Sequence, residues 1–231
     1  MKILLLMNYN GYHGREYMSA LLKNKITFDV ILIKNNNTLK YNNLEDKRTN
    51  SNWQPEDLEK MIDKVENHYC YKSIEDPELL NHLNHSKYQI GIQGGGLGII
   101  NKKLIDKFSL GLLNFHPGDL PEYRGSSAPE WQILEGKEII ATCHLIDESI
   151  DTGDIIGKKK LNLNYSDYFK MRADIYPQIS LFLIEVIFQI IQNKGIKILK
   201  KQNENDAIYR KYIGDEVIEN LKVKMKRKII F

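Results

Sequence analysis

Cysteine is scarce in this sequence. The 231 residues include two cysteines, Cys70 and Cys143, which lie far apart and form neither a C-x-x-C pair nor a spacing typical of zinc ligands. We therefore expect two reduced, mostly buried thiols, as in a cytoplasmic protein, with a disulfide as the alternative.

Long apolar runs and an excess of charge are absent as well. No run reaches the roughly 18 apolar residues of a membrane span. The N-terminal stretch MKILLLMNYN is too short in its apolar part for a secretory signal, and no small-residue cleavage site follows it. The net charge is only +3, which does not favour nucleic acid as a partner. The basic residues 222–230 are typical of a solvated helix face or a frayed end, with a phosphate or RNA contact as the alternative.

The 42% of hydrophobic residues is enough for one sizeable core, and their pattern predicts an α/β fold. Continuous apolar runs of strand length occupy residues 2–8 and 28–35, and apolar residues with helical spacing lie between them. This order is a βαβ unit, and continuously apolar strands imply a parallel sheet. We predict a Rossmann-like, mostly parallel sheet with helices on both faces.

The rest of the chain alternates in the same way. Further strands are predicted at 88–93, 110–116, 139–147 and 155–164, and helices at 55–67, 76–87, 101–108, 126–136 and 167–193, the last ended by Gly195. The short turn after residue 147 indicates that the later strands are antiparallel. The polar, asparagine-rich residues 35–53 predict a long loop. We expect a main domain at 1–195 and a short extension at 196–231, made of a strand at 196–201 and a helix or hairpin.

Two polar motifs could carry chemistry. Asn114 and His116 end the predicted strand at 110–116 on one face, at the sheet edge where α/β proteins place ligands. Taken alone, a buried pair satisfied by the backbone is the alternative. The stretch IDTGDII places Asp151 and Asp154 around a Thr-Gly turn, for which an ordinary turn is the alternative. Together, these motifs supply an amide, an imidazole and a carboxylate, which are the groups that an enzyme needs for an acyl transfer without a covalent intermediate.

The sequence LLNFHPGDLPEYRGSSAPEWQILEGKEIIATCHLIDESIDTGDII, residues 112–156, resembles the core of the folate-dependent formyltransferases. The likeness lies in N-x-H-P, L-P-x-x-R-G, a helix with Pro129 that ends in a glycine, T-x-H and D-T-G-D. A weaker likeness covers QNENDAIYRK, residues 202–211, which is similar to the Q-x4-A-x-Y-x-K signature of the branches that formylate tRNA and sugars.

The resemblance implies a formyltransferase fold, N10-formyltetrahydrofolate as the cofactor and Asn114, His116 and Asp151 as the catalytic residues. Asn114 and protonated His116 would stabilise the developing oxyanion, and Asp151 would hold the imidazolium and help to remove the proton of the amine. The cofactor pocket would involve Gly96, Leu97, Gly98, Ile99, Ile100, His144, Ile146, Asp147 and Asp154. Asn101 departs from the family, which often has proline there. We expect no metal, although His116, His144 and Asp151 as a metal site stays an alternative.

The family's branches differ in the amine that they formylate. The tRNA branch adds a C-terminal β-barrel, for which residues 196–231 are too few, and the purine branch lacks the 202–211 signature. The short sugar N-formyltransferases are the most similar, which implies a small-molecule substrate, a dTDP-linked 4-amino-4,6-dideoxy sugar of O-antigen (lipopolysaccharide) or other surface glycans. Another small amine such as glycinamide ribonucleotide, or a non-catalytic folate-binding or nucleotide-binding protein, stays open. Substrate contacts are expected at Tyr9, Tyr12, His13, Arg15, Tyr123, Arg124 and Trp131, with structural roles as the alternative.

The oligomeric state stays open in the sequence. The apolar face of the long helix, with Ile179, Phe182, Ile187 and Ile190, and the C-terminal residues 217–231 could form a homodimer or simply cover the core.

Overall fold

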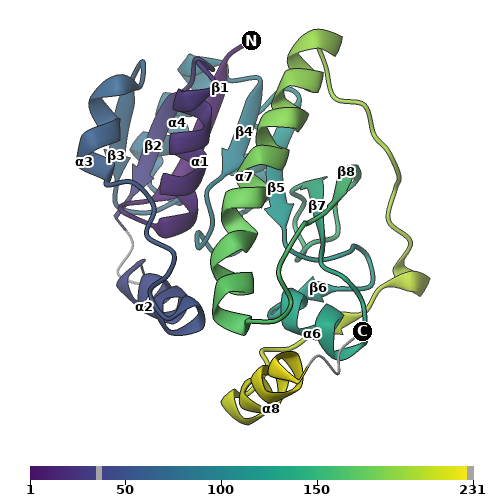
Figure 1. The fold of residues 1–231 in the computed structure, drawn as a ribbon. Coiled ribbons are helices and arrows are strands. Elements are labelled where there is room, and N and C mark those ends of the chain that lie inside the picture. Colours follow the sequence, from purple (N-terminus) through teal and green to yellow (C-terminus); the bar gives the residue numbers. More distant parts are fainter. Residues whose placement is uncertain (35–37, 228–231) are drawn as a thin grey trace.

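The computed structural model describes residues 1–34 and 38–227, and its centre is a seven-stranded sheet in the order β3-β2-β1-β4-β5-β7-β8 (Figure 1). The strands are β1 (Ile3–Asn8), β2 (Asp29–Ile33), β3 (His68–Tyr71), β4 (Ile90–Gln93), β5 (Gly111–His116), β7 (Ile140–Leu145) and β8 (Ile155–Lys160). The pairs from β3 to β5 are parallel, whereas β5–β7 and β7–β8 are antiparallel. The predicted fold class is therefore confirmed, including the antiparallel later strands.

Helices cover both faces of this sheet. They are α1 (Tyr12–Lys23), α2 (Thr38–Thr49), α3 (Leu58–Met61), α4 (Pro77–Ser86), α5 (Lys102–Ile105), α6 (Ala128–Leu134), α7 (Tyr168–Asn193) and α8 (Asp215–Lys226). In Figure 1, α1 and α7 lie side by side on one face. Leu5 of β1 belongs to the core cluster that includes α1 and α7, while Leu4 and Leu6 belong to the cluster that includes α4. Both faces are buried, which explains why the strand is apolar at every position.

The long helix α7 covers the core. By length and composition it could cross a membrane, with a mean hydropathy of 1.5, but 50% of that window is buried inside the protein. Ile179, Phe182, Ile187 and Ile190 are all buried, so these four residues pack within the chain itself. The helix ends at Asn193, and the next residue, Lys194, takes the left-handed conformation. Gly195, which was expected to end the helix, follows Lys194 instead.

Three sequence-based predictions are wrong. Residues 38–49 of the expected loop form α2, while residues 35–37 lie outside the described part. The expected strand at 196–201 forms only an isolated bridge between Ile155 and Lys200, and β3 was not predicted. The helix expected at 55–67 is reduced to α3 and a 3₁₀ turn at Ile62–Lys64. Helix α2 forms although its sequence has a low helix propensity, because a buried ion pair between Glu45 and Arg172, 3.0 Å long, stabilises it.

The C-terminal segment returns to pair with the chain that follows β5. A second, two-stranded sheet pairs β6 (Arg124–Gly125) in parallel with β9 (Tyr209–Arg210), which follows a 3₁₀ turn at Glu204–Asp206. Helix α8 buries Ile218, Leu221 and Met225. Its described residues thus help to cover the core.

The two cysteines are both free thiols, which excludes the alternative of a disulfide between them. Cys143 is buried in β7, as predicted, but Cys70 is exposed on β3. The error follows from missing β3, whose side chains alternate between exposed and half-buried.

Candidate active site

The sheet places three of the predicted residues at one point. In the antiparallel pair of β5 and β7, Asn114 lies opposite His144, and the turn after β7 brings Asp151 to both. Asn114 Nδ2 is 3.1 Å from His144 Nε2 and 3.4 Å from Asp151 Oδ1. His116, two residues along β5, has its Nδ1 3.5 Å from Asp151 Oδ2. The three predicted catalytic side chains therefore form one cluster, with His144 as a fourth member.

Both ring nitrogens of His116 face acceptors. Nδ1 faces the Asp151 carboxylate at 3.5 Å, and Nε2 lies 2.6 Å from the backbone carbonyl of Tyr123. The ring of His116 is therefore held between the Asp151 carboxylate and the backbone that precedes β6.

Asp151 is the anion of the cluster. Burial alone would raise the pKa of its carboxyl, but the neighbouring His116, His144 and the Gly125 N–H, which donates at 2.9 Å, hold that pKa well below its usual range. The carboxylate is thus ionised at neutral pH. Asp151 also has a φ of 56°, which lies in the left-handed region that residues other than glycine disfavour.

A cavity of about 650 Å³ opens over this cluster, a volume typical of small-ligand sites. Asn114, His144 and Asp151 line it, whereas the buried His116 supports them from behind. The other lining residues are Tyr41, Gln93, Gly96, Gly98, Ile99, Ile100, Gly125, Ser126, Ile146, Asp147, Ser149, Ile150, Tyr209, Arg210 and Lys211.

Most of the predicted cofactor residues line this cavity. The exceptions are Leu97, which is buried in the core, and Asp154, whose backbone carbonyl accepts a hydrogen bond from Leu145 at 2.9 Å. Gly96 has a φ of 69°, and its carbonyl accepts a hydrogen bond from Asn8 Nδ2 at 2.8 Å. Asn8 therefore holds this glycine loop in place, a role that the sequence did not indicate.

The predicted substrate residues do not line the cavity. Trp131 Nε1 donates to the carbonyl of Lys211 at 2.9 Å, the Tyr123 hydroxyl donates to Glu135 at 2.5 Å, and Arg124 is fully buried. Trp131 thus connects α6 to the residue that follows β9, and Arg124 is part of β6 itself. A substrate role for these three residues stays a prediction.

The residues after β1 lie elsewhere. Tyr12 bonds Asp46 of α2, His13 packs on the ring of Tyr176, and Arg15 donates to the carbonyl of Glu56. Tyr9 is 42% exposed. Tyr12, His13 and Arg15 hold structure around α2, and a substrate role for these residues stays a prediction.

Some lining residues were missed. Tyr209 and Lys211 belong to the Q-x4-A-x-Y-x-K signature, so their position in the motif was a usable signal. Tyr41 stands on the unexpected helix α2 beside Gly96, and only the tertiary structure could reveal it.

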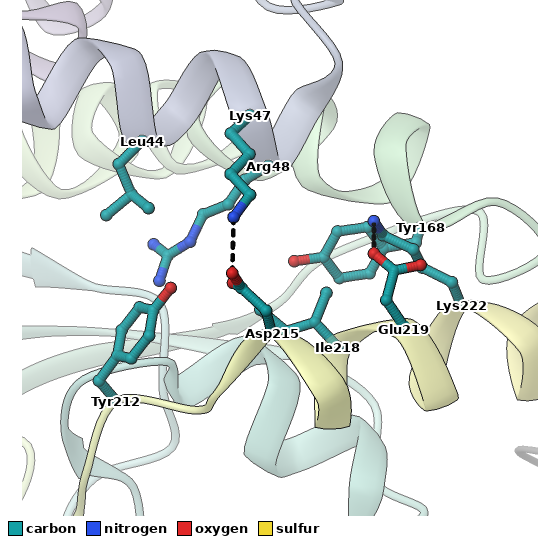
Figure 2. A pocket seen from close by; sticks show the side chains of 9 residues that line it. All are labelled: Leu44, Lys47, Arg48, Tyr168, Tyr212, Asp215, Ile218, Glu219 and Lys222. Atoms are coloured by element: carbon teal, nitrogen blue, oxygen red, sulfur yellow. Dashed lines mark hydrogen bonds and ion pairs between the residues drawn. The ribbon is translucent and has the colours of Figure 1, made fainter.

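A second, much smaller cavity lies between α2 and α8 (Figure 2). Its free volume of about 20 Å³ has room for a water molecule rather than a ligand. Two ion pairs lie beside it, Lys47–Asp215 at 2.8 Å and Lys222–Glu219 at 2.7 Å (Figure 2). It shares no lining residue with the larger cavity, and it marks the place where α2 and α8 pack against each other. Across residues 1–34 and 38–227, no group of three or more His, Cys, Asp or Glu is arranged to hold a metal ion.

Residues 1–170 match the family model described as formyl transferase. The chain belongs to the formyl transferase family. The match covers both halves of the active-site cluster, β5 with Asn114 and His116 and the turn with Asp151, so the resemblance seen in the sequence is confirmed.

Among curated relatives of this formyl transferase chain, methionyl-tRNA formyltransferase of Finegoldia magna is 31% identical over 142 residues, which are 59% of this chain and 44% of that protein. The enzyme of the same name from Rickettsia typhi is 32% identical over 61% of this chain and 46% of that protein. The chain thus spans less than half the length of these relatives.

Solved structures share the fold at lower identity. A sugar N-formyltransferase from a Shewanella species has a TM-score of 0.62 at 16% identity, covering 98% of this chain and 88% of that chain. The N-formyltransferase of Helicobacter canadensis, in complex with folinic acid and dTDP-3-aminofucose, has a TM-score of 0.61 at 23% identity, covering 91% and 71%. Glycinamide ribonucleotide transformylase 1 of Symbiobacterium toebii has a TM-score of 0.59 at 17% identity, covering 87% and 94%.

Proposed function

We propose that this chain is an N-formyltransferase that moves the formyl group of N10-formyltetrahydrofolate to the amine of a nucleotide-linked amino sugar. The first candidate is a dTDP-linked 4-amino-4,6-dideoxy sugar used for O-antigen or other surface glycans. One observation carries the proposal: the amide of Asn114 and the ionised carboxylate of Asp151 meet in a cavity of about 650 Å³, supported by His116.

The wall from Gly96 to Ile100 fits a folate. Gly96 and Gly98 offer backbone without side chains, which permits a flat ring to approach closely. Ile99 is 68% exposed, so its apolar surface is available to pack on that ring. The Helicobacter canadensis enzyme of the same fold was solved with folinic acid, which supports a folate here. When bound, the cofactor supplies a formyl carbon that an amine can attack.

Asn114 and His116 would stabilise the negative charge that develops on the formyl oxygen. The two N–H groups of Asn114 Nδ2 face His144 Nε2 at 3.1 Å and Asp151 Oδ1 at 3.4 Å. The longer contact, to Asp151, would give way so that this N–H donates to the oxyanion. A protonated His116 would place a positive charge behind it. Removing a donor of this kind typically lowers the rate by about 10²–10³.

Asp151 would act mainly as the partner of that positive charge. Because its pKa is held well below the usual range, the carboxylate is a weak proton acceptor. Its stabilisation of the imidazolium is therefore the larger effect, and its help in removing the proton of the amine is the smaller one.

A second group of lining residues suits a nucleotide-linked substrate. It consists of Gly125 and Ser126 with Tyr209, Arg210 and Lys211. The two cations are suited to a diphosphate, although Arg210 is already paired with Glu135 at 2.7 Å. The names of similar structures include dTDP-linked and UDP-linked amino sugars, which supports this class of acceptor.

The proposal is tested with a panel of amines. The purified chain is mixed with N10-formyltetrahydrofolate and, in separate reactions, a dTDP-4-amino sugar, a dTDP-3-amino sugar, a UDP-4-amino sugar, glycinamide ribonucleotide or methionyl-tRNA. Mass spectrometry then detects the gain of one formyl group. We expect formylation of a nucleotide-linked amino sugar. Formylation of only the ribonucleotide or the tRNA would overturn the sugar substrate, and folate binding without transfer to any amine would indicate the non-catalytic alternative.

Two further expectations belong to this proposal. Free thiols at Cys70 and Cys143 fit a reducing compartment such as the cytoplasm. A homodimer formed through α7 would use the exposed Leu181, Phe188 and Ile191, because the four α7 residues considered for it are buried in the core.

A further inference from the structure

Gln202 connects the C-terminal segment to the turn that carries Asp151. Its Nε2 donates to the backbone carbonyl of Asp151 at 2.9 Å and to that of Gly153 at 2.7 Å. Its Oε1 accepts from Nε and Nη2 of Arg124, at 3.1 and 2.9 Å. All the hydrogen-bonding groups of this one amide are thus used between the turn and Arg124.

Arg124 is a fixed anchor for this amide. Its side chain is fully buried, and its Nη1 forms an ion pair with Glu204 at 2.9 Å. The next residue, Gly125, donates its backbone N–H to the Asp151 carboxylate at 2.9 Å. Arg124 and Gly125 therefore hold Asp151 from two directions, the carbonyl through Gln202 and the carboxylate directly.

The turn needs such support. Asp151 has a φ of 56°, a conformation that residues other than glycine disfavour. Strained backbone of this kind persists where surrounding contacts over-determine it. The two hydrogen bonds from Gln202 lie on the strained residue and on the glycine two positions later.

We propose that Gln202 is a positioning residue for formyl transfer, which holds the 151–153 turn so that the Asp151 carboxylate stays between His116 and His144. This inference rests on the proposed role of Asp151. Gln202 lies outside the family match at residues 1–170, so the C-terminal segment becomes part of the active site's construction.

The variant Gln202→Glu separates this role from a simple partnership with Arg124. Glutamate keeps an acceptor for the guanidinium but loses both N–H donors and sets an anionic oxygen against two carbonyls. We expect kcat to fall at least about tenfold with little change in KM, because small displacements of catalytic groups are costly. Gln189→Glu, at an exposed site on α7, makes the same chemical change as a control.

A wild-type kcat in a folded Gln202→Glu variant would overturn the proposal, since Gln202 would then serve only to satisfy Arg124. If that variant fails to fold, Gln202→Asn replaces it, because a shorter amide cannot span the turn and Arg124 together. The same fall in kcat is expected for it, and a wild-type kcat would again contradict the role.

A second measurement does not depend on an acceptor. In NMR spectra of the substrate-free protein, we expect the ring signals of His116 and His144 to shift in Gln202→Glu and to stay unchanged in Gln189→Glu. Unchanged ring signals in Gln202→Glu would overturn the positioning role. Should the wild-type protein formylate no amine, the proposed function fails, while the NMR result still decides whether Gln202 holds the turn.

Discussion

At the scale of single residues, the Asp151 carboxylate organises the cluster. It lies 3.5 Å from a ring nitrogen of each of His116 and His144 and accepts the Gly125 N–H. The carboxylate keeps its charge because these three neighbours outweigh the effect of burial on its pKa. One buried anion thus orients two imidazoles and the Asn114 amide.

Asn114→Ala tests the proposed donor. The substitution removes an amide whose Nδ2 is held at 3.1 Å from His144, without deleting a charge. We expect kcat for formyl transfer to fall about 10²–10³-fold, while the dissociation constant of the folate changes little. Steady-state kinetics and a folate titration measure the two quantities. Asn162→Ala, at an exposed position, is the control, and an unchanged kcat in Asn114→Ala would contradict the donor role.

The sequence predicted the grouping of Asn114, His116 and Asp151 better than the other residues of the cavity. Asn114 and His116 share a strand face, and Asp151 stands in a recognisable turn, so local pattern and family resemblance were enough. Tyr41 could not be found in this way, and Gln202, although it is the first residue of the 202–211 signature, could not be given a role. Their positions depend on α2 packing beside the glycine loop and on the C-terminal segment returning to β6, which are contacts between residues distant in sequence.

At the scale of elements, α2 is held by buried charge. Glu45 is 5% exposed and pairs with Arg172 at 3.0 Å and with Arg48 at 3.2 Å. Burial raises the pKa of Glu45, but Arg172 and the other neighbouring groups lower that pKa by more than burial raises it. The pKa of Glu45 therefore lies below its usual value. The helix has little apolar surface of its own, which is why its sequence looked like a loop.

Glu45→Ala should therefore destabilise the protein strongly. The change leaves the buried guanidinium of Arg172 with one carboxylate fewer, and breaking a buried pair costs roughly 3–5 kcal/mol. Denaturant or thermal unfolding measures the loss of unfolding free energy. Glu59→Ala, on an exposed site of α3, should change it by less than about 0.5 kcal/mol. Equal stabilities of the two variants would show that the pair does not hold α2.

The junction of α1, α2 and α7 should also make stability depend on pH. His13 is half-buried between Trp53 and Tyr176, and its partial loss of solvent lowers its pKa to about 4, a shift that Glu45 opposes and Arg172 and Arg48 reinforce. Below pH 6.5 the unfolded chain binds a proton that the folded one does not. Stability is therefore lost as pH falls from about 6.5 to about 4, by up to roughly 3 kcal/mol.

His13→Phe should reduce this pH dependence. Unfolding free energies at several pH values between 7 and 4 measure the slope for the wild type and the variant. His85→Phe, at an exposed position, should keep the wild-type slope. A wild-type slope in His13→Phe would show that the proton uptake occurs elsewhere.

At the scale of the whole molecule, the sheet apart from its edge strand β3 follows from the sequence, whereas the C-terminal segment does not. Continuous apolar strands with helices between them predict the parallel half, and a short turn predicts the antiparallel half. The segment at 196–201 has an apolar pattern like that of a strand, but it forms only one bridge, to Ile155. Its continuation as β9 then pairs with β6 and closes one wall of the cavity.

We propose that the Asn114, His116 and Asp151 cluster transfers a formyl group to a nucleotide-linked amino sugar. The most direct measurement is the rate of formyl transfer from N10-formyltetrahydrofolate to a dTDP-linked 4-amino-4,6-dideoxy sugar, by the wild-type protein and by Asp151→Asn. We predict formylated sugar with the wild type and a rate at least about a hundredfold lower with the variant. Equal rates in the two proteins, or no sugar product with the wild type, would contradict the account.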